Sequence, residues 1–489
     1  MVTFQVDLAG ASRRLPHFWE RVVGSGHAPL ALRADWQQQL RRCHQELGFN
    51  YVRFHGLLSH PMYTLINHAG GFVYSFFNAD QIIDFLLSIG MRPFVELSFM
   101  PAALASGAKT VFSYASNVTP PRDYEQWATL IGKLVRHWVE RYGPAEVRQW
   151  FLEVWNEPNL DHFWAGNQEE YFRLYRYTVE AIKEIDPSLR VGGPATAQNE
   201  WIADFLDYCD RNDLPVDFVT THYYPTDAFG RTTTPTEKKL ADTPRDVMGR
   251  RARQAREQAG KLPLYYTEWN IASNPRHELH DLPFAAASAG SILMDVAGCV
   301  DGYSYWTFSD IFEELYFPSE PFHGGFGLLT LHGIAKPVYR AFQMLHSLGN
   351  EQLPVEGQHE TVRCWVVRKE DEITALIVNH ARPHHPIETE TVNVELMDSA
   401  QAKPAAQPSR ATLRRIDDEH ANARRTWEEM GRPGYLDQYQ LAELQVASQV
   451  RAEPLSWQKR NGDVTLAIDV PPHGFAAMNV SLRPKEQDG

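Results

Sequence analysis

The stretch QWFLEVWNEPN, residues 149–159, begins as an apolar run typical of a buried strand and ends in a polar tip. The stretch LYYTEWN, residues 264–270, repeats this plan later in the chain. Each places one glutamate, Glu157 or Glu268, at the carboxyl end of a predicted strand. In a parallel barrel these strand ends meet at one mouth. We therefore expect the two carboxyl groups to face each other there.

Short apolar strands alternate with helical stretches on both sides of these motifs. The predicted strands cover residues 30–32, 51–54, 92–97, 150–155, 191–193, 218–221, 264–267 and 302–306. Each precedes a helical stretch, the second of which begins with Asn78 as a candidate cap. This repetition predicts an α/β fold, a (β/α)8 TIM barrel in which the two glutamates close strands four and seven. A doubly wound sheet is the alternative, but the glycine-rich turn that it predicts does not occur.

The two ends of the chain have a different pattern. Residues 2–8 alternate apolar and polar, which is typical of a half-buried strand in an antiparallel sheet. After residue 350 short alternating strands return, at residues 361–368, 373–379, 391–396, 412–416, 464–470 and 476–482. We expect an accessory antiparallel β-sandwich built from both termini. The predicted division is a strand at 1–13, a barrel at 14–350 and a sandwich at 351–489, with a helical insertion near 417–457.

Composition restricts the classes of partner. A net charge of −14 argues against nucleic acid and anionic membranes. No run of 18 apolar residues occurs, and the first ten residues, MVTFQVDLAG, lack the pattern of a signal peptide, so a cytoplasmic location is expected. Four cysteines lie far apart without zinc spacing and are predicted to be reduced.

Two facing carboxyl groups are what acid-assisted cleavage of a glycosidic bond requires. One must be protonated near neutral pH to donate to the leaving oxygen, and the other must be ionised to attack the anomeric carbon. Asn156, next to Glu157, can bind the sugar 2-hydroxyl. The structural alternative is a pair of carboxylates in salt bridges at the barrel mouth. Neither a His-x-His at the first strand nor H-E-x-x-H occurs, so we predict no metal and no cofactor.

Further polar and aromatic residues follow other predicted strands. Arg53 and His55 lie two apart and share one face of a strand. Glu96, His222, Tyr224 and Trp306 also stand at strand ends, and Glu313 and Glu314 follow strand eight. These residues can bind and stack on a sugar. The histidines could instead be buried structural residues, and the two glutamates a charged rim.

Together these residues identify a family. The chain resembles glycoside hydrolase family 39, and in particular its bacterial β-D-xylosidases. The motifs that carry the resemblance are VRFHGLL (52–58), GMRPFVELSFMPAALASG (90–107), NVTPPRD (117–123), EVWNEPNL (153–160), VDFVTTHYY (216–224), YWTFSDIFEE (305–314) and FHGGFGL (322–328). The resemblance implies a retaining enzyme with Glu157 as acid/base and Glu268 as nucleophile. It also implies substrate contacts from His55, Phe112, Asn156, His222, Tyr224, Trp306, Glu313 and Glu314.

The leading hypothesis is an exo-acting hydrolase that releases xylose from the non-reducing end of short xylo-oligosaccharides by double displacement. An α-L-iduronidase-like activity is the alternative within the family, but its substrate carboxylate needs a cation, and only Arg53 stands among the candidates. An α-L-arabinosidase side activity and a non-catalytic sugar-binding protein are also kept open. The expected partner is a small oligosaccharide, and assembly into a homo-oligomer is left open.

Overall fold

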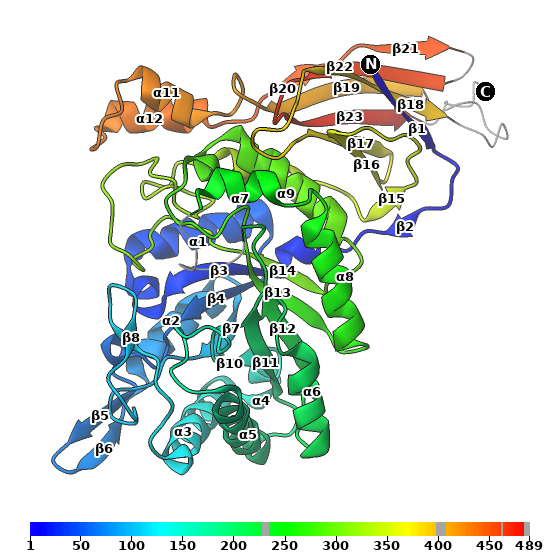
Figure 1. Cartoon of the computed structure of the whole chain (residues 1–489). Helices are drawn as coiled ribbons and strands as arrows, with labels where there is room; N and C mark the ends of the chain where they lie inside the picture. The colour runs from blue at the N-terminus through cyan, green and yellow to red at the C-terminus, as the bar shows by residue number, and fades with distance from the viewer. Residues whose placement is uncertain (227–233, 398–406, 461–462, 484–489) are drawn as a thin grey trace.

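The computed structural model describes residues 1–226, 234–397, 407–460 and 463–483. Eight parallel strands close into a barrel in the lower part of Figure 1. In barrel order they are β3 (Val22–His27), β4 (Tyr51–His55), β7 (Arg92–Leu97), β10 (Phe151–Val154), β11 (Arg190–Ala197), β12 (Phe218–His222), β13 (Leu264–Trp269) and β14 (Gly302–Tyr305). The predicted TIM barrel is confirmed. Glu157 follows the fourth barrel strand and Glu268 lies in the seventh.

Helices surround the barrel, and most of them are amphipathic. They are α1 (Ala34–Leu47), α2 (Phe77–Ser88), α3 (Tyr124–Tyr142), α5 (Gln168–Ile185), α6 (Ile202–Arg211), α8 (Val247–Ala259), α9 (Pro283–Val296) and α10 (Pro337–His346). Helix α3 shows why they form here. The Asp123 side chain caps its first turn, Trp127, Leu130 and Leu134 form one buried face, and Gly143 follows its last residue. The shorter helices α4 (Pro144–Val147) and α7 (Thr236–Asp242) lie in connecting segments.

The first barrel strand differs from the prediction. Residues 30–32 lie in a 3-10 helix, Ala28–Leu32, and the strand is β3, Val22–His27. Its sequence VVGSGH lacks a continuous apolar run because two aromatic rings press against its glycines. A Cβ on Gly24 would lie 2.5 Å from the Trp306 ring, and one on Gly26 would lie 2.9 Å from Phe312. Helix α2 also starts one residue before Asn78, whose side chain does not cap it.

The strands at the two ends of the chain form two further sheets, seen at the top of Figure 1. The four-stranded sheet has the order β1 (Val2–Asp7), β18 (Glu390–Met397), β22 (Asp463–Val470) and β21 (Trp457–Arg460). The seven-stranded sheet has the order β2 (Arg13–Arg14), β15 (Glu351–Leu353), β16 (Val362–Lys369), β17 (Glu372–Asn379), β23 (Phe475–Arg483), β19 (Gln407–Ile416) and β20 (Ala452–Pro454). An accessory unit built from both termini is therefore confirmed.

Strand β1 corrects one expectation about this unit. It pairs with β18 in parallel, from Val2 opposite Val392 to Asp7 opposite Met397, whereas its alternation suggested an antiparallel neighbour. Alternation reports that one face is buried and does not report the direction of the partner strand. Phe4 and Val6 fill the core between the two sheets.

The sandwich packs on the barrel through α9. Phe475 of β23 lies so close to Gly290 of α9 that a Cβ there would be 2.5 Å from its ring. The predicted helical insertion contains α11 (Ala423–Glu429) and α12 (Gln438–Ala447), and Trp427 packs on Phe322 of the barrel. Strands β2 and β15 pair with each other at the two points where the domain boundaries were placed. The division at 13 and 350 itself stays a prediction.

Two smaller features concern the surroundings of the chain. Within the described ranges no helix is both long and apolar enough to span a membrane. All four cysteines are free, and Cys43 and Cys209 are buried.

Candidate active site

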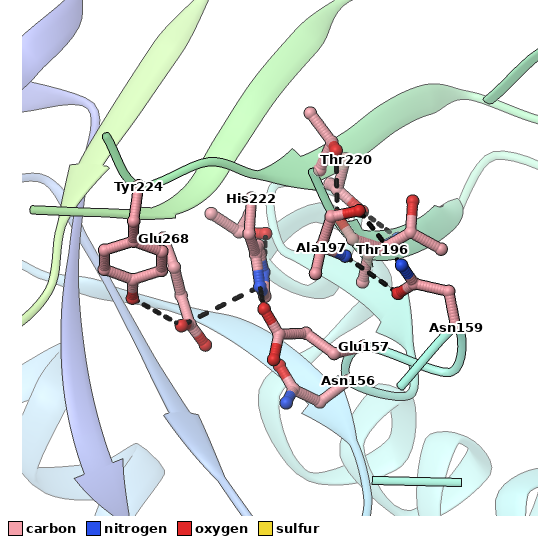
Figure 2. Close-up of polar contacts among 12 residues, drawn as sticks. Asn156, Glu157, Asn159, Thr196, Ala197, Thr220, His222, Tyr224 and Glu268 are labelled. Atoms are coloured by element: carbon pink, nitrogen blue, oxygen red, sulfur yellow. Dashed lines mark hydrogen bonds and ion pairs between the residues drawn. The ribbon is translucent and has the colours of Figure 1, made fainter. Parts of the chain in front are cut away.

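The carboxyl ends of the barrel strands surround one pocket with about 580 Å³ of empty space. Nine of the ten predicted site residues line it, namely His55, Phe112, Asn156, Glu157, His222, Tyr224, Glu268, Trp306 and Glu314. Figure 2 shows the central part, in which His222 lies between Glu157 and Glu268. The structure thus brings together residues that are up to 259 positions apart, from His55 to Glu314.

The chain places Glu157 by an unusual turn at the end of β10. Trp155 has φ 71° and Glu157 has φ 44°, both in the left-handed region that side chains disfavour. Two hydrogen bonds fix this turn, from the Trp155 indole to the Phe163 carbonyl at 2.8 Å and from the Glu157 N–H to the Ala195 carbonyl at 2.8 Å. Strained backbone of this kind gathers at functional sites.

The two central carboxyl groups are close together. One oxygen of Glu157, one oxygen of Glu268 and one ring nitrogen of His222 lie within 4.8 Å of one another. Retaining glycosidases hold their carboxyl groups about 5–5.5 Å apart, and inverting ones about 6.5–9.5 Å. The spacing is therefore of the retaining kind. These three atoms could also ligate a metal ion, and the absence of a metal stays a prediction from the sequence motifs.

The two carboxyl groups have different surroundings. Burial raises the pKa of Glu157 well above its usual range, and the nearby Glu268 adds to this rise. Glu268 receives two hydrogen bonds instead, from Arg53 Nη1 to Oε1 at 2.8 Å and from the Tyr224 hydroxyl to Oε2 at 2.9 Å (Figure 2 shows the second). Glu157 is thus suited to carry a proton, while the partners of Glu268 pair with a carboxylate.

Arg53 is the cation on which these acidic groups converge. It is fully buried and donates to Glu153 Oε2 at 2.5 Å and to Asn156 Oδ1 at 2.9 Å, and it pairs with Glu96 at 2.8 Å as well as with Glu268. Burial opposes its charge, but the acidic side chains of Glu153, Glu96 and Glu268 raise the pKa of Arg53 above its usual value. Its planar fork of donors suits several oxygens at once.

Aromatic and polar side chains lie side by side in the pocket around His55. The Trp306 ring lies 4.7 Å from the His55 ring, and Phe112 stacks on His55 at 6.0 Å. His55 Nδ1 bonds Glu96 Oε2 at 2.7 Å, and its Nε2 lies 3.6 Å from Glu314 Oε1. That oxygen of Glu314 has no hydrogen-bond partner within the described part of the chain. Aromatic faces beside free polar atoms suit a sugar ring.

Glu313 is the predicted site residue that the structure does not bring to the pocket. Its carboxylate bonds the Nδ1 of His27 at 3.0 Å. Neighbouring residues in an extended segment point to opposite sides, so the sequence pair Glu313-Glu314 could not show which one faces inward.

Sequence reasoning also missed two residues behind the pocket, Glu153 and Thr267. Both are fully buried, and Oε1 of Glu153 lies 2.8 Å from Oγ1 of Thr267. The signal for Glu153 was its position as the one charged residue in the apolar strand FLEV. A buried acidic side chain in a strand needs hydrogen-bond partners, and a search for them would have led to Arg53.

The comparisons with known proteins place the chain in a family. The family model of glycosyl hydrolases family 39 matches residues 2–465. The chain belongs to this family. One relative of this family 39 protein is a beta-xylosidase of Caldicellulosiruptor saccharolyticus, 48% identical over 476 residues that cover 96% of each chain. A second is a beta-xylosidase of Geobacillus stearothermophilus, 40% identical over 85% of this chain and 83% of that protein.

A solved structure extends the likeness to the whole fold of this family 39 protein. It is that of a monomeric beta-xylosidase from Caulobacter crescentus CB15, with a TM-score of 0.86 and 35% sequence identity. The match covers 99% of this chain and 100% of the other. The chain is thus a glycoside hydrolase.

Proposed function

We propose that this protein is a retaining exo-β-D-xylosidase that removes xylose from the non-reducing end of xylo-oligosaccharides. The observation that carries the proposal is the pair Glu157 and Glu268, close enough for double displacement and held in different surroundings, one with a raised pKa and the other bonded to Arg53 and Tyr224. The names of the similar beta-xylosidases support the choice of sugar.

In the first step a carboxylate oxygen of Glu268 attacks the anomeric carbon. The bond from that carbon to the leaving oxygen breaks, and Glu157 gives its proton to that oxygen. In the second step Glu157, now ionised, takes a proton from a water molecule, whose oxygen attacks the anomeric carbon and releases Glu268. Arg53 holds the Asn156 amide through its Oδ1, which leaves the amide NH2 for a sugar hydroxyl.

The substrate proposed is neutral. No arginine or lysine is among the residues found to line the described pocket, whereas Glu157, Glu268 and Glu314 are. These acidic groups disfavour the carboxylate of an iduronide. The enclosure of the pocket by residues from β4, β12 and β13 and from the loops after β10 and β14 supports release of a terminal sugar rather than cleavage inside a long chain.

The first test is p-nitrophenyl β-D-xylopyranoside with the released sugar followed by proton NMR in the opening minutes. We expect β-xylose to appear first and to mutarotate later. α-Xylose first would mean inversion and would remove Glu268 as nucleophile. If no xylose is released but the matching α-L-iduronide or α-L-arabinofuranoside is cleaved, the choice of sugar is wrong. Binding without turnover of any of these would favour a sugar-binding protein.

Two further properties belong to this proposal. We propose a cytoplasmic location, which the free thiols support because disulfides are rare in that compartment. The oligomeric state stays open, and light scattering of the purified protein measures it.

A further inference from the structure

A row of hydrogen-bonded side chains leads from Glu157 away from the pocket. Glu157 Oε1 lies 2.9 Å from His222 Nδ1, and His222 Nε2 lies 3.1 Å from Thr267 Oγ1. Thr267 Oγ1 in turn lies 2.8 Å from Glu153 Oε1. His222, Thr267 and Glu153 are all fully buried, so water does not compete for these bonds. The protons in the row can therefore be assigned by counting donors.

The assignment starts at His222. Burial, with Arg53 and His55 nearby, lowers the pKa of His222 well below its usual value, so the ring is neutral and carries one proton. Its Nδ1 faces Glu157 Oε1 at 2.9 Å and Glu268 Oε2 at 3.7 Å. To act as an acid, Glu157 must carry its proton on the oxygen that faces the leaving group, so the Oε1 beside this ring has no proton to donate, and a bare nitrogen there would face only lone pairs. The proton is therefore on Nδ1, and Nε2 is an acceptor.

The remaining protons follow from this tautomer. Nε2 must accept from the Thr267 hydroxyl, which has a single proton. Because the Thr267 proton is bonded to His222, Thr267 cannot also donate to Glu153. The 2.8 Å contact between Thr267 and Glu153 therefore needs a hydrogen-bond donor on Glu153. Only a protonated Glu153 supplies it. Its second oxygen still accepts from Arg53 Nε at 2.5 Å.

We propose that Glu153 is a neutral carboxylic acid which, through Thr267 and His222, directs an N–H at the acid/base residue Glu157. It acts as a positioning residue and touches no substrate. The His222 Nδ1–H then stays bonded to Oε1 of Glu157 while the second carboxyl oxygen of Glu157 loses its proton. This hydrogen bond stabilises the Glu157 carboxylate as it forms. This role rests on the proposed function of Glu157.

The charged neighbours are consistent with a neutral Glu153. Burial raises the pKa of Glu153, and Glu96 of β7 adds to the rise, whereas Arg53 of β4 opposes it. Thr267 of β13 and Tyr171 of α5 also lie close by. Glu157 faces Glu268, Arg53, Glu96, His222 and Glu314 from the other strands and loops.

Glu96 provides a matched control inside the same cluster. It is equally buried and also bonds Arg53, at 2.8 Å. Burial would raise its pKa, but His55 and Arg53 outweigh burial and hold the pKa of Glu96 below its usual range. Glu96 and Glu153 are thus equally buried and share Arg53 as a partner, but Glu96 is predicted to be ionised and Glu153 to be protonated.

The experiment is infrared difference spectroscopy at neutral pH on the full chain, with Glu153→Gln and Glu96→Gln each compared with wild type. Glu153→Gln should remove a carboxylic acid C=O band, while Glu96→Gln should remove only carboxylate bands. The reverse pattern would overturn the proposal. Because no turnover is needed, this result stands apart from any failure of the proposed xylosidase activity.

Kinetics test the positioning role. Glu153→Leu removes the donor to Thr267 and should lower kcat/KM for xylobiose, and Glu153→Gln, whose amide NH2 can replace the acid O–H as donor, should restore most of it. Thr267→Val leaves Nε2 without a donor and should lower kcat/KM by roughly tenfold, as expected for one buried unpaired group. Thr267→Ser should restore it. A large loss in Glu153→Gln, or no rescue by serine, would refute the role.

Discussion

Arg53 Nη1 donates to Glu268 Oε1 at 2.8 Å, across the interior of the barrel from β4 to β13. The same guanidinium pairs with Glu96 and Glu153, so one buried side chain of β4 links three other barrel strands, β7, β10 and β13. The Arg53 side chain therefore both positions the nucleophile Glu268 and stabilises the barrel.

Replacing Arg53 by methionine should destabilise the fold. It would leave Glu96 and Glu268 buried without their cation, and breaking a buried ion pair from one side costs about 3–5 kcal/mol. Guanidinium unfolding measures the change. Arg176→Met is the control, because the Arg176–Glu180 pair is half exposed on both sides and contributes little. Equal losses in both variants would contradict the role of Arg53.

Glu268→Ala should abolish turnover of p-nitrophenyl β-D-xylopyranoside, because no group remains to form the glycosyl-enzyme. Glu313→Ala is its control, since the Glu313 carboxylate bonds His27 and lies away from the pocket. Initial rates and thermal melting of both variants are measured together. Loss of activity in Glu313→Ala with an intact fold would show that Glu313 contacts substrate after all.

Glu157→Ala should affect substrates unequally. Xylobiose needs a proton for its leaving sugar and should lose roughly 10²–10⁴-fold in rate, the usual contribution of a general acid. A nitrophenyl xyloside leaves without protonation and should keep its first step, shown by a burst of nitrophenolate in stopped flow. Equal losses for both substrates would remove Glu157 as the acid.

The pH profile should show the same difference. Burial and Glu268 raise the pKa of Glu157, so Glu157 is protonated at neutral pH and loses its proton as the pH rises through this raised value. kcat/KM for xylobiose should therefore fall on the alkaline side. For the nitrophenyl xyloside this alkaline fall should be weaker. If kcat/KM falls in the same way at high pH for both substrates, the fall is caused by the titration of a group other than Glu157.

Glu314→Gln should change stability in a pH-dependent way. Burial, with Glu268 and Glu157 nearby, raises the pKa of Glu314 well above its usual value. A carboxyl group with a raised folded pKa stabilises the fold at low pH, and that contribution is lost as the pH rises above about 4.3, the unfolded value. Glutamine never ionises, so the melting temperature of Glu314→Gln should gain on wild type as pH increases. A constant difference would mean that Glu314 is not neutral in the fold.

Much of the fold could be predicted from the sequence because barrel strands carry dense apolar runs. Arg92–Leu97 and Tyr124–Tyr142 lie where the pattern placed them. The pattern failed at β3, where Gly24 and Gly26 make room for aromatic rings from the loop after β14. A strand whose composition is set by a distant neighbour cannot be found from its own residues.

The pocket was predictable for a different reason. Strand ends meet in a barrel, so polar residues at those ends were expected to meet. Glu153 and Thr267 lie one layer deeper, within strands, and their importance follows from hydrogen-bond distances that no spacing reveals.

The parallel pairing of β1 with β18 has a consequence for synthesis on the ribosome. Val2 pairs with Val392, which is 390 residues further along the chain (392 − 2). At about 5–20 residues per second, roughly 20–80 s pass between the emergence of the two partners. During that interval the first segment of the nascent chain waits without its neighbour, with Phe4 and Val6 uncovered. Closure of the sandwich is therefore a late event, which waits until β18 has followed the whole barrel out of the ribosome.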